Sequence, residues 1–241
     1  AYEYEYRDLP VAEYEYEAGG FRRRLTLRGG GAMLFLMMRI PTGKEISELQ
    51  SAAIGEWYGG EVGQPEIGES DQFRALVLEQ CSRNYQLWNQ EDQARRTDVD
   101  DSVIAGVKRA IDKLNQQRND LIEKLDEALL GELEAGMNAA APLNSETAGS
   151  IVDRMAIMGL KCHHMAREAG REDAGEEHRA KCAARLAVLR EQRGDLGACF
   201  DELVSASRRG KRRFKVYRQY KMYNDPSLNP ELYRRKGNSG T

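Results

Sequence analysis

Two long stretches of this chain repeat apolar side chains in alternating steps of four and three residues. In the first stretch these positions are Val107, Ile111, Leu114, Leu121, Leu125 and Ala128. In the second stretch they are Cys182, Leu186, Leu189, Leu196, Phe200 and Leu203. This spacing places the repeated side chains on one face of an α-helix, and a repeat of this length is typical of helices that pack side by side. The sequence therefore predicts two long amphipathic helices as the framework of the fold.

A shorter helical stretch precedes each of the two long ones. Ser70 is a suitable capping residue before the apolar side chains of residues 73–88, and another helix with the four-and-three spacing begins near Ser150. Thr42 and Glu45 form a capping-box pattern at the start of one more short helix. We therefore predict an all-α fold. Its four-helix-bundle-like core consists of two helical hairpins, at about residues 71–133 and 150–207.

Composition divides the chain into four segments. The predicted bundle spans residues 70–207, a short helix and linker span residues 33–69, and a basic aromatic C-terminal segment spans residues 208–241. Residues 1–32 form an irregular N-terminal extension, in which alternating Tyr and Glu lead into an Arg- and Gly-rich stretch before Met33. We interpret this extension either as a translated leader, with Met33 as the natural start, or as a disordered arm.

The net charge of −3 hides a strong asymmetry. Residues 208–241 contain eleven Lys or Arg and two acidic residues, which leaves −12 on residues 1–207. Aromatic side chains recur at every third position here, at Phe214, Tyr217, Tyr220 and Tyr223. We predict an ordered strap over the acidic bundle, with Val216, Tyr220 and Tyr223 docked on it. Cations left unpaired would form one wall of an anion site, whose candidate residues are Lys215, Tyr217, Arg218 and Lys221.

The composition is that of a helix-rich globular protein, with 41% hydrophobic and 31% charged residues. No apolar run reaches the roughly 20 residues that a transmembrane helix needs, so no membrane partner is predicted. The four cysteines lack close pairing, which favours free thiols over a disulfide framework. We therefore predict a cytoplasmic protein.

One arginine interrupts the apolar seam of each long helix, and the sequences around the two arginines are alike. The segments LNQQRNDL and LREQRGDL place Arg118 and Arg193 at the same position. This likeness indicates either a duplicated hairpin or the limited alphabet of amphipathic helices. Two buried guanidinium groups at one height would form an anion pocket. In the alternative, each arginine pairs with a carboxylate of a neighbouring helix, such as Glu91, Asp92 or Asp153, or extends its charged end to solvent.

Asp153, Lys161 and His164 lie on one predicted helix and resemble an acid–base set. Asp153 and His164 share a face of that helix, but the eleven residues between their positions correspond to about 16 Å along its axis. A residue from a facing helix is therefore needed to complete a site there. We keep Asp153 and His164 as ligand-binding candidates.

Two patterns bear on metal binding. Glu123 and Asp126 have an E-x-x-D spacing that Mg²⁺-binding pyrophosphohydrolase bundles use, but the helix before them has no matching E-x-x-E. Cys162, His178 and Cys182 flank one predicted helix turn. Cysteines on apolar seams usually act as small hydrophobic residues, and this spacing matches no standard zinc template. We predict no metal and no cofactor.

Several stretches of the chain resemble one bacterial family. The second half resembles it at LNSETAGSIVDRMAIMGLK, EQRGDL and RRFKVYRQYKMYNDPSLNP, and the first half at NYQLWNQEDQAR and AIDKLNQQRNDLIE. It is a domain-of-unknown-function family, number forty-two fifty-four, and the resemblance covers about residues 70–230. The resemblance implies no known activity, so it transfers no catalytic residues to this chain.

These observations favour an anion-binding or interaction module, whose basic C-terminal segment contacts a phosphate-bearing ligand or a nucleic acid. Two alternatives stay open. One is a metal-dependent all-α hydrolase similar to nucleotide pyrophosphohydrolases, and the other is a structural subunit of a homo-oligomer. The sequence does not decide whether the protein is an enzyme.

Overall fold

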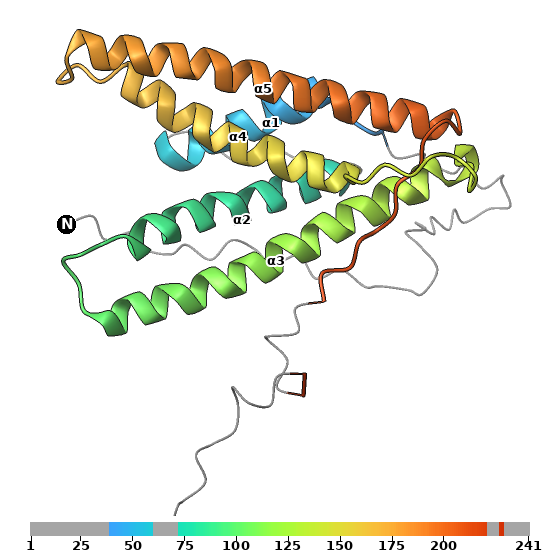
Figure 1. Ribbon diagram of the computed structural model, residues 1–241, viewed down its shortest axis with the longest axis horizontal. Helices are drawn as coiled ribbons and strands as arrows, with labels where there is room; N and C mark the ends of the chain where they lie inside the picture. The colour runs from blue at the N-terminus through green and yellow to red at the C-terminus, as the bar shows by residue number, and fades with distance from the viewer. Residues whose placement is uncertain (1–38, 60–71, 221–226, 229–241) are drawn as a thin grey trace, which may run out of the picture. The chain divides into compact units, whose positions relative to one another are not determined.

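The computed structural model describes residues 39–59, 72–220 and 227–228, and these residues are mostly helical (Figure 1). The helices are α1 (Gly43–Gly59), α2 (Gln72–Ala94), α3 (Asp101–Leu133), α4 (Ala148–Ala169) and α5 (Glu176–Arg208), with a 3-10 turn at Glu134–Gly136. Within the described ranges the one β-type contact is an isolated bridge between Leu143 and Arg213. The predicted all-α fold is confirmed. The interpretation of residues 1–32 lies outside the described residues.

Two antiparallel hairpins form the core, as predicted. Helix α2 packs along α3, and α4 packs along α5 (Figure 1). The apolar seams meet in one buried cluster, to which α3 contributes Leu121 and Leu125 and α5 contributes Phe200 and Leu203. The seam of α3 is less covered towards its beginning, where Val107 and Leu114 are only half-buried. The four-and-three spacing therefore locates the helix faces correctly.

Helix α1 adds a fifth helix to this core. Its capping box is confirmed, because the Glu45 backbone N–H donates to Thr42 Oγ1 at 3.2 Å and the Thr42 N–H donates to Glu45 Oε2 at 2.8 Å. The helix packs against α2, α4 and α5. Its buried face includes Ile46, Gln50 and Ile54, all of them at most 1% exposed. The short helix is thus part of the bundle and forms one wall of the pocket described below.

The C-terminal segment returns from the end of α5 across the loop before α4 (Figure 1). Gly210 has a φ of 64°, a left-handed conformation that glycine adopts without strain. The chain then pairs with the loop, since the Asn144 N–H donates to the Arg213 carbonyl at 2.7 Å and the Arg213 N–H donates to the Pro142 carbonyl at 3.1 Å. Phe214, which is 1% exposed, joins the main apolar cluster and anchors the segment.

The prediction of the docked aromatic residues needs a correction. The side chain that enters the core is Phe214, whereas Val216 is half-buried and Tyr220 is 84% exposed. Phe214 reaches the core because the bridge at Arg213 holds the backbone against the bundle just before it. Tyr223 lies outside the described residues.

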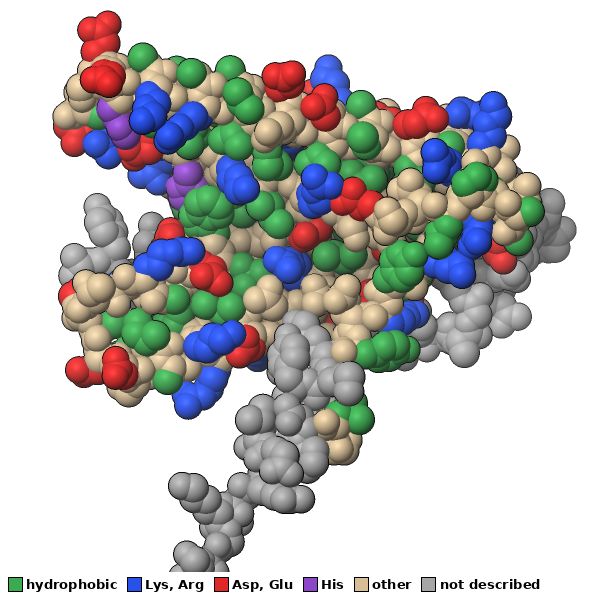
Figure 2. Space-filling model, viewed as in Figure 1, with side chains coloured by type: hydrophobic (Ala, Val, Ile, Leu, Met, Phe, Trp, Pro, Cys, Tyr) green, Lys and Arg blue, Asp and Glu red, His purple; other side chains and the backbone are tan. Residues whose placement is uncertain are grey.

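None of the described helices combines the length and the apolar character needed to cross a membrane. On the described part of the face shown in Figure 2, Lys and Arg side chains are interspersed with Asp and Glu. The charge asymmetry of the sequence is therefore not visible there as a patch of one sign.

Candidate anion-binding pocket

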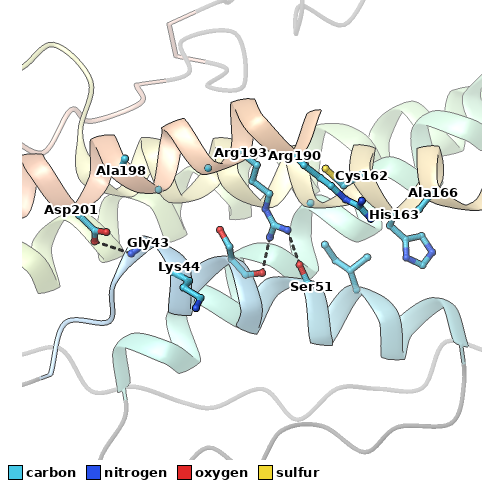
Figure 3. Close-up of a pocket in the computed structure, with 15 residues that line it drawn as sticks. Gly43, Lys44, Ser51, Cys162, His163, Ala166, Arg190, Arg193, Ala198 and Asp201 are labelled. Atoms are coloured by element: carbon cyan, nitrogen blue, oxygen red, sulfur yellow. Dashed lines mark hydrogen bonds between the residues drawn. The ribbon is translucent and has the colours of Figure 1, made fainter. Parts of the chain in front are cut away.

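A pocket of about 620 Å³ lies between α1, α4 and α5 (Figure 3). Its basic side chains are Lys44, Arg190 and Arg193. Its hydroxyl groups come from Ser47 and Ser51, and Asp201 is the one carboxylate among the described lining residues. Cys162, His163 and Ala166 line the end of the pocket farthest from Asp201 (Figure 3). We call this cavity the Arg193 pocket.

Arg193 is the central residue of the pocket and is 8% exposed. Its Nε donates to the Met155 carbonyl at 3.1 Å. Its Nη2 donates to the Ser47 carbonyl at 2.9 Å and to Gln50 Oε1 at 3.1 Å, and its Nη1 donates to Ser51 Oγ at 2.6 Å. Every one of these acceptors is neutral, and no carboxylate among the described residues forms an ion pair with Arg193. Its hydrogen bonds are largely satisfied, but its charge is not neutralised.

Two glycine contacts make room for this arrangement. A Cβ atom on Gly159 of α4 would lie 2.9 Å from Arg193 Nη2, so a larger residue would displace the guanidinium. A Cβ atom on Gly43 would lie 2.3 Å from the Gly197 carbonyl oxygen, which shows how closely α1 crosses α5. The Gly43 N–H donates to Asp201 Oδ1 at 2.8 Å and fixes this crossing. The sequence thus brings α1 close enough for its serines to face Arg193.

Burial sets the protonation of the groups in the pocket. It lowers the pKa of Arg193 below its ordinary value, although an arginine stays charged at neutral pH. Burial raises the pKa of the Cys162 thiol, which Arg193 and Arg190 lower in part. Burial also lowers the pKa of His163, and the neighbouring His164 and Arg167 add to this effect. Cys162 and His163 are therefore mainly neutral at pH 7.

The remaining donors of the pocket are accessible. Arg190 is exposed and forms no hydrogen bond or ion pair with any described residue. Lys44 is exposed too, and its Nζ lies 3.7 Å from Glu48 in a solvent-facing pair. Ser51 is exposed and accepts a hydrogen bond from Arg193, so its own O–H remains able to donate. These groups can bind an oxyanion.

Arg118 has the structural role that the sequence left as an alternative. Its Nε lies 3.8 Å from Asp153 Oδ1, and it does not line the Arg193 pocket. Asp153 also accepts hydrogen bonds from the side-chain amides of Gln80 and Asn84, the latter at 2.9 Å. Burial raises the pKa of Asp153, while Arg118 and the two amides lower it. Arg118 and Arg193 therefore occupy different surroundings and do not form one anion pocket.

Asp153 and His164 do not come together. His164 Nε2 lies 3.0 Å from the Tyr58 hydroxyl, and its ring stacks on Trp88 with a centroid distance of 4.6 Å. Burial lowers its pKa, and Asp92 opposes this shift. His164 thus belongs to an aromatic cluster at the ends of α1 and α2. The contacts of these two residues support no acid–base pair.

The C-terminal candidates differ in their contacts. Arg218 pairs with Glu123 at 2.8 Å and with Glu127, and the Gln219 N–H donates to Glu123 at 2.8 Å. Lys215 is exposed and has no hydrogen bond or ion pair with a described residue, and Tyr217 is 45% exposed. Lys221 lies outside the described residues. The strap therefore uses Arg218 on the bundle itself.

The two metal patterns are engaged in other contacts. Asp126 is buried and accepts a hydrogen bond from the Gly149 N–H at 2.6 Å, at the start of α4. His178 Nε2 lies 3.0 Å from Glu168 and 3.4 Å from Cys182 Sγ, whereas Cys162 lines the Arg193 pocket. Within residues 39–59, 72–220 and 227–228, no three His, Cys, Asp or Glu side chains are placed to hold a metal ion.

Sequence reasoning identified Arg193 but missed the other pocket residues Lys44, Ser51, Gly159 and Arg190. Ser47 and Ser51 are four residues apart and so share one face of α1, which was a usable signal for a polar helix face. The partner of that face was not recognisable, because Ser51 lies 142 residues from Arg193 along the chain.

The five packed helices define an all-α protein with a helical-bundle core. The chain matches the family described as protein of unknown function (DUF4254) over residues 74–216, which is more than half of its 241 residues. The protein belongs to this family, as the sequence resemblance indicated. None of the curated proteins and none of the solved structures matches the chain.

Proposed function

We propose that the protein binds an oxyanion-bearing small molecule in the Arg193 pocket. The observation that carries this proposal is that Arg193 is buried at the pocket and has no carboxylate partner among the described residues. A buried cation is costly unless an opposite charge compensates it. A bound anion would supply that charge, in a site where solvent screening is weaker than at the surface.

The groups around Arg193 support the same proposal. Arg190 and Lys44 add two cations to the lining, and Ser51 adds a hydroxyl donor. Guanidinium groups suit oxyanions because their planar N–H groups match pairs of oxygens. Arg190 has no competing partner among the described residues, so it is available to a ligand.

Cys162 offers a direct test, because it lines the pocket and is half-buried. The intact protein is treated with N-ethylmaleimide in chloride or in inorganic phosphate at equal ionic strength, and each modified cysteine is quantified by mass spectrometry. Phosphate should slow the modification of Cys162. Cys199 is exposed and outside the lining, so its rate should not change.

A matched pair of variants assigns the protection to the pocket. Arg190 and Arg185 both lie on α5, both are exposed, and neither has a described partner, but only Arg190 lines the pocket. Arg190→Gln should abolish the protection and Arg185→Gln should preserve it. Equal modification of Cys162 with and without phosphate would overturn the proposed function.

The basic C-terminal segment supports a second candidate function, the binding of a nucleic acid. Lys211, Arg212 and Lys215 are exposed and have no hydrogen bond or ion pair with a described residue, while Tyr217 and Tyr220 expose aromatic surface. Cations neutralise phosphates and aromatic rings stack on bases.

Fluorescence anisotropy with a single-stranded oligonucleotide tests this second function. Replacing the three cations by glutamine should weaken binding. The slope of log Kd against log salt should fall by about 2, because three phosphate contacts to a single strand are lost at about 0.7 each. An unchanged slope, or no binding at low salt, would eliminate this candidate.

The two alternatives from the sequence have different support. The hydrolase depends on Asp126 as a metal ligand, and Asp126 is bound to the start of α4. A structural role of the strap is supported by the burial of Phe214 and by the contacts of Arg218 with α3. Such a role is compatible with anion binding, because the Arg193 pocket is lined by α1, α4 and α5.

A further inference from the structure

We propose that the occupant of the Arg193 pocket is a phosphate monoester, with its dianionic phosphate near Arg190, Arg193 and Ser51 and its organic group towards Cys162 and Ala166. This inference rests on the proposed function, which requires only an oxyanion. It adds the charge of the ligand, the type of its anionic group and its orientation.

The charge of the pocket matches a dianion. Lys44, Arg190 and Arg193 contribute three positive charges, and Asp201 contributes one negative charge, so the lining carries a net charge of +2. His163 contributes no full charge at neutral pH, because burial lowers its pKa. A carboxylate would neutralise half of this charge. A phosphate monoester above its second pKa, which is about 6, would neutralise nearly all of it.

The centre of the pocket is also rich in donors. Ser51 accepts from Arg193 and keeps its hydroxyl proton for a ligand, and Arg190 has all five of its N–H groups available among the described contacts. Arg193 uses four of its five N–H groups on protein acceptors. This excess of donors suits the three terminal oxygens of a phosphate better than the two oxygens of a carboxylate.

The two ends of the pocket differ in a way that orients the ligand. Asp201 lies at one end, where it accepts from the Gly43 N–H, and its negative charge repels a phosphate (Figure 3). At the other end lie Cys162, His163 and Ala166, beyond Arg190 (Figure 3). The His163 ring stacks on Tyr58 with a centroid distance of 4.6 Å, so this end has a fixed, mainly uncharged wall. An apolar or planar organic group therefore fits this end.

Isothermal titration calorimetry with four small probes tests the proposal on the full-length protein. The probes are phenyl phosphate, phenyl sulfate, benzoate and inorganic phosphate, each at constant ionic strength. At pH 7.5 phenyl phosphate should bind at least about tenfold more tightly than phenyl sulfate or benzoate, which are monoanions. It should also bind more tightly than inorganic phosphate, which lacks the organic group.

The pH dependence separates the dianion from other anions. Between pH 7.5 and pH 5 phenyl phosphate loses its second charge and should bind about tenfold more weakly, whereas phenyl sulfate keeps its single charge. Protonation of His163 at low pH would strengthen the binding of any anion, which is the opposite of the expected change. A loss of affinity therefore reports on the charge of the ligand.

Each outcome distinguishes this inference from the proposed function. Arg190→Gln should weaken the binding of phenyl phosphate at least about tenfold, while Arg185→Gln should leave its affinity unchanged. If phenyl sulfate and benzoate bind as tightly as phenyl phosphate, the assignment of the ligand as a phosphate monoester is wrong. The proposed function as an oxyanion-binding pocket is then unaffected. If inorganic phosphate binds as tightly as phenyl phosphate, the proposed orientation is wrong. If no probe binds and none protects Cys162, the proposed function fails as well.

Discussion

Arg118 and Arg193 occupy the same position in two helices of similar sequence, but they meet different partners. Arg118 lies 3.8 Å from the carboxylate of Asp153, in a cluster that α2, α3 and α4 form together. Arg193 donates only to neutral acceptors, on α4 and α1, beside an open pocket. The charge of the half-buried Arg118 is compensated by a carboxylate, and the charge of the buried Arg193 is not.

This difference shows how equivalent residues acquire different roles. Asp153 lies beside Arg118 and compensates its charge, so this pair leaves no net positive charge for a ligand. Arg193 is accommodated by Gly159 and by the polar face of α1, which satisfy its hydrogen bonds without neutralising it. The fold therefore keeps a cation at the pocket.

The largest effect on stability is expected for Arg193→Met. This change removes the donor to Gln50 Oε1, a fully buried acceptor, and leaves a gap beside Gly159. We expect a loss of about 2–3 kcal/mol in the free energy of unfolding, measured by urea denaturation. Arg185→Met on the exposed side of α5 is the control and should cost less than about 0.5 kcal/mol. A neutral or stabilising Arg193→Met would mean that the cost of burying the charge exceeds the value of its hydrogen bonds.

Asp126 is the converse case, a buried carboxylate without a basic partner among the described residues. Burial raises its pKa from 3.8 to about 7, although hydrogen bonds from Thr147 and Gly149 lower it. The folded protein therefore holds this proton more tightly than the unfolded chain, and it loses stability as the pH rises from about 4 to about 7. Asp126→Asn removes this titration and should gain on the order of 2 kcal/mol relative to the wild type over that range. Parallel stability curves for the two proteins would contradict a raised pKa.

Arg118→Met should show a pH dependence that Arg193→Met lacks. Without Arg118 the pKa of Asp153, already raised by burial, rises further. The variant should therefore lose about 1–2 kcal/mol at alkaline pH and recover stability as the pH falls through this raised pKa and Asp153 becomes protonated. Urea titrations at a series of pH values measure the effect. If the cost of Arg118→Met is the same at all pH values, the pair with Asp153 does not compensate its charge.

The smallest effect is expected for Arg218→Ala on the strap. Arg218 pairs with Glu123 and Glu127, but nearly half of its side chain is exposed and solvent screens the pair. We expect a loss of about 0.5 kcal/mol in low salt that disappears in high salt. The same change removes a positive charge beside Glu123 and Glu127, whose negative charges raise the pKa of Asp126, and should therefore raise that pKa slightly. A salt-independent loss would point to packing instead of charge.

The regular parts of this fold were readable from the sequence. The four-and-three spacing located the helix faces, and Thr42 with Glu45 located the start of α1, because both depend on neighbours within one turn or one helix. The sequence leaves the pairing of Arg118 with Asp153 open beside a shared anion pocket. Only the structure distinguishes the two, because both arginines lie in apolar seams with the same spacing.

The pocket itself could not be predicted from the sequence, because contacts between distant segments create it. Ser51 and Arg193 meet only where α1 crosses α5 at Gly43 and Gly197, and no periodicity within a helix encodes that crossing. The same reason explains the error at the strap. The sequence predicts that Tyr220 docks on the bundle. In the structure the bridge at Arg213 places Phe214 in the core, and Tyr220 is exposed.

The most direct test of the uncompensated charge at Arg193 is the melting temperature of the protein in increasing inorganic phosphate, at constant ionic strength. A ligand that binds only the folded state raises the melting temperature as its concentration exceeds Kd. We predict a rise with the logarithm of phosphate concentration for the wild type, for Arg118→Met and for Arg185→Gln, and its loss in Arg190→Gln. Equal rises in all four proteins, or a rise lost in Arg118→Met but kept in Arg190→Gln, would contradict the account.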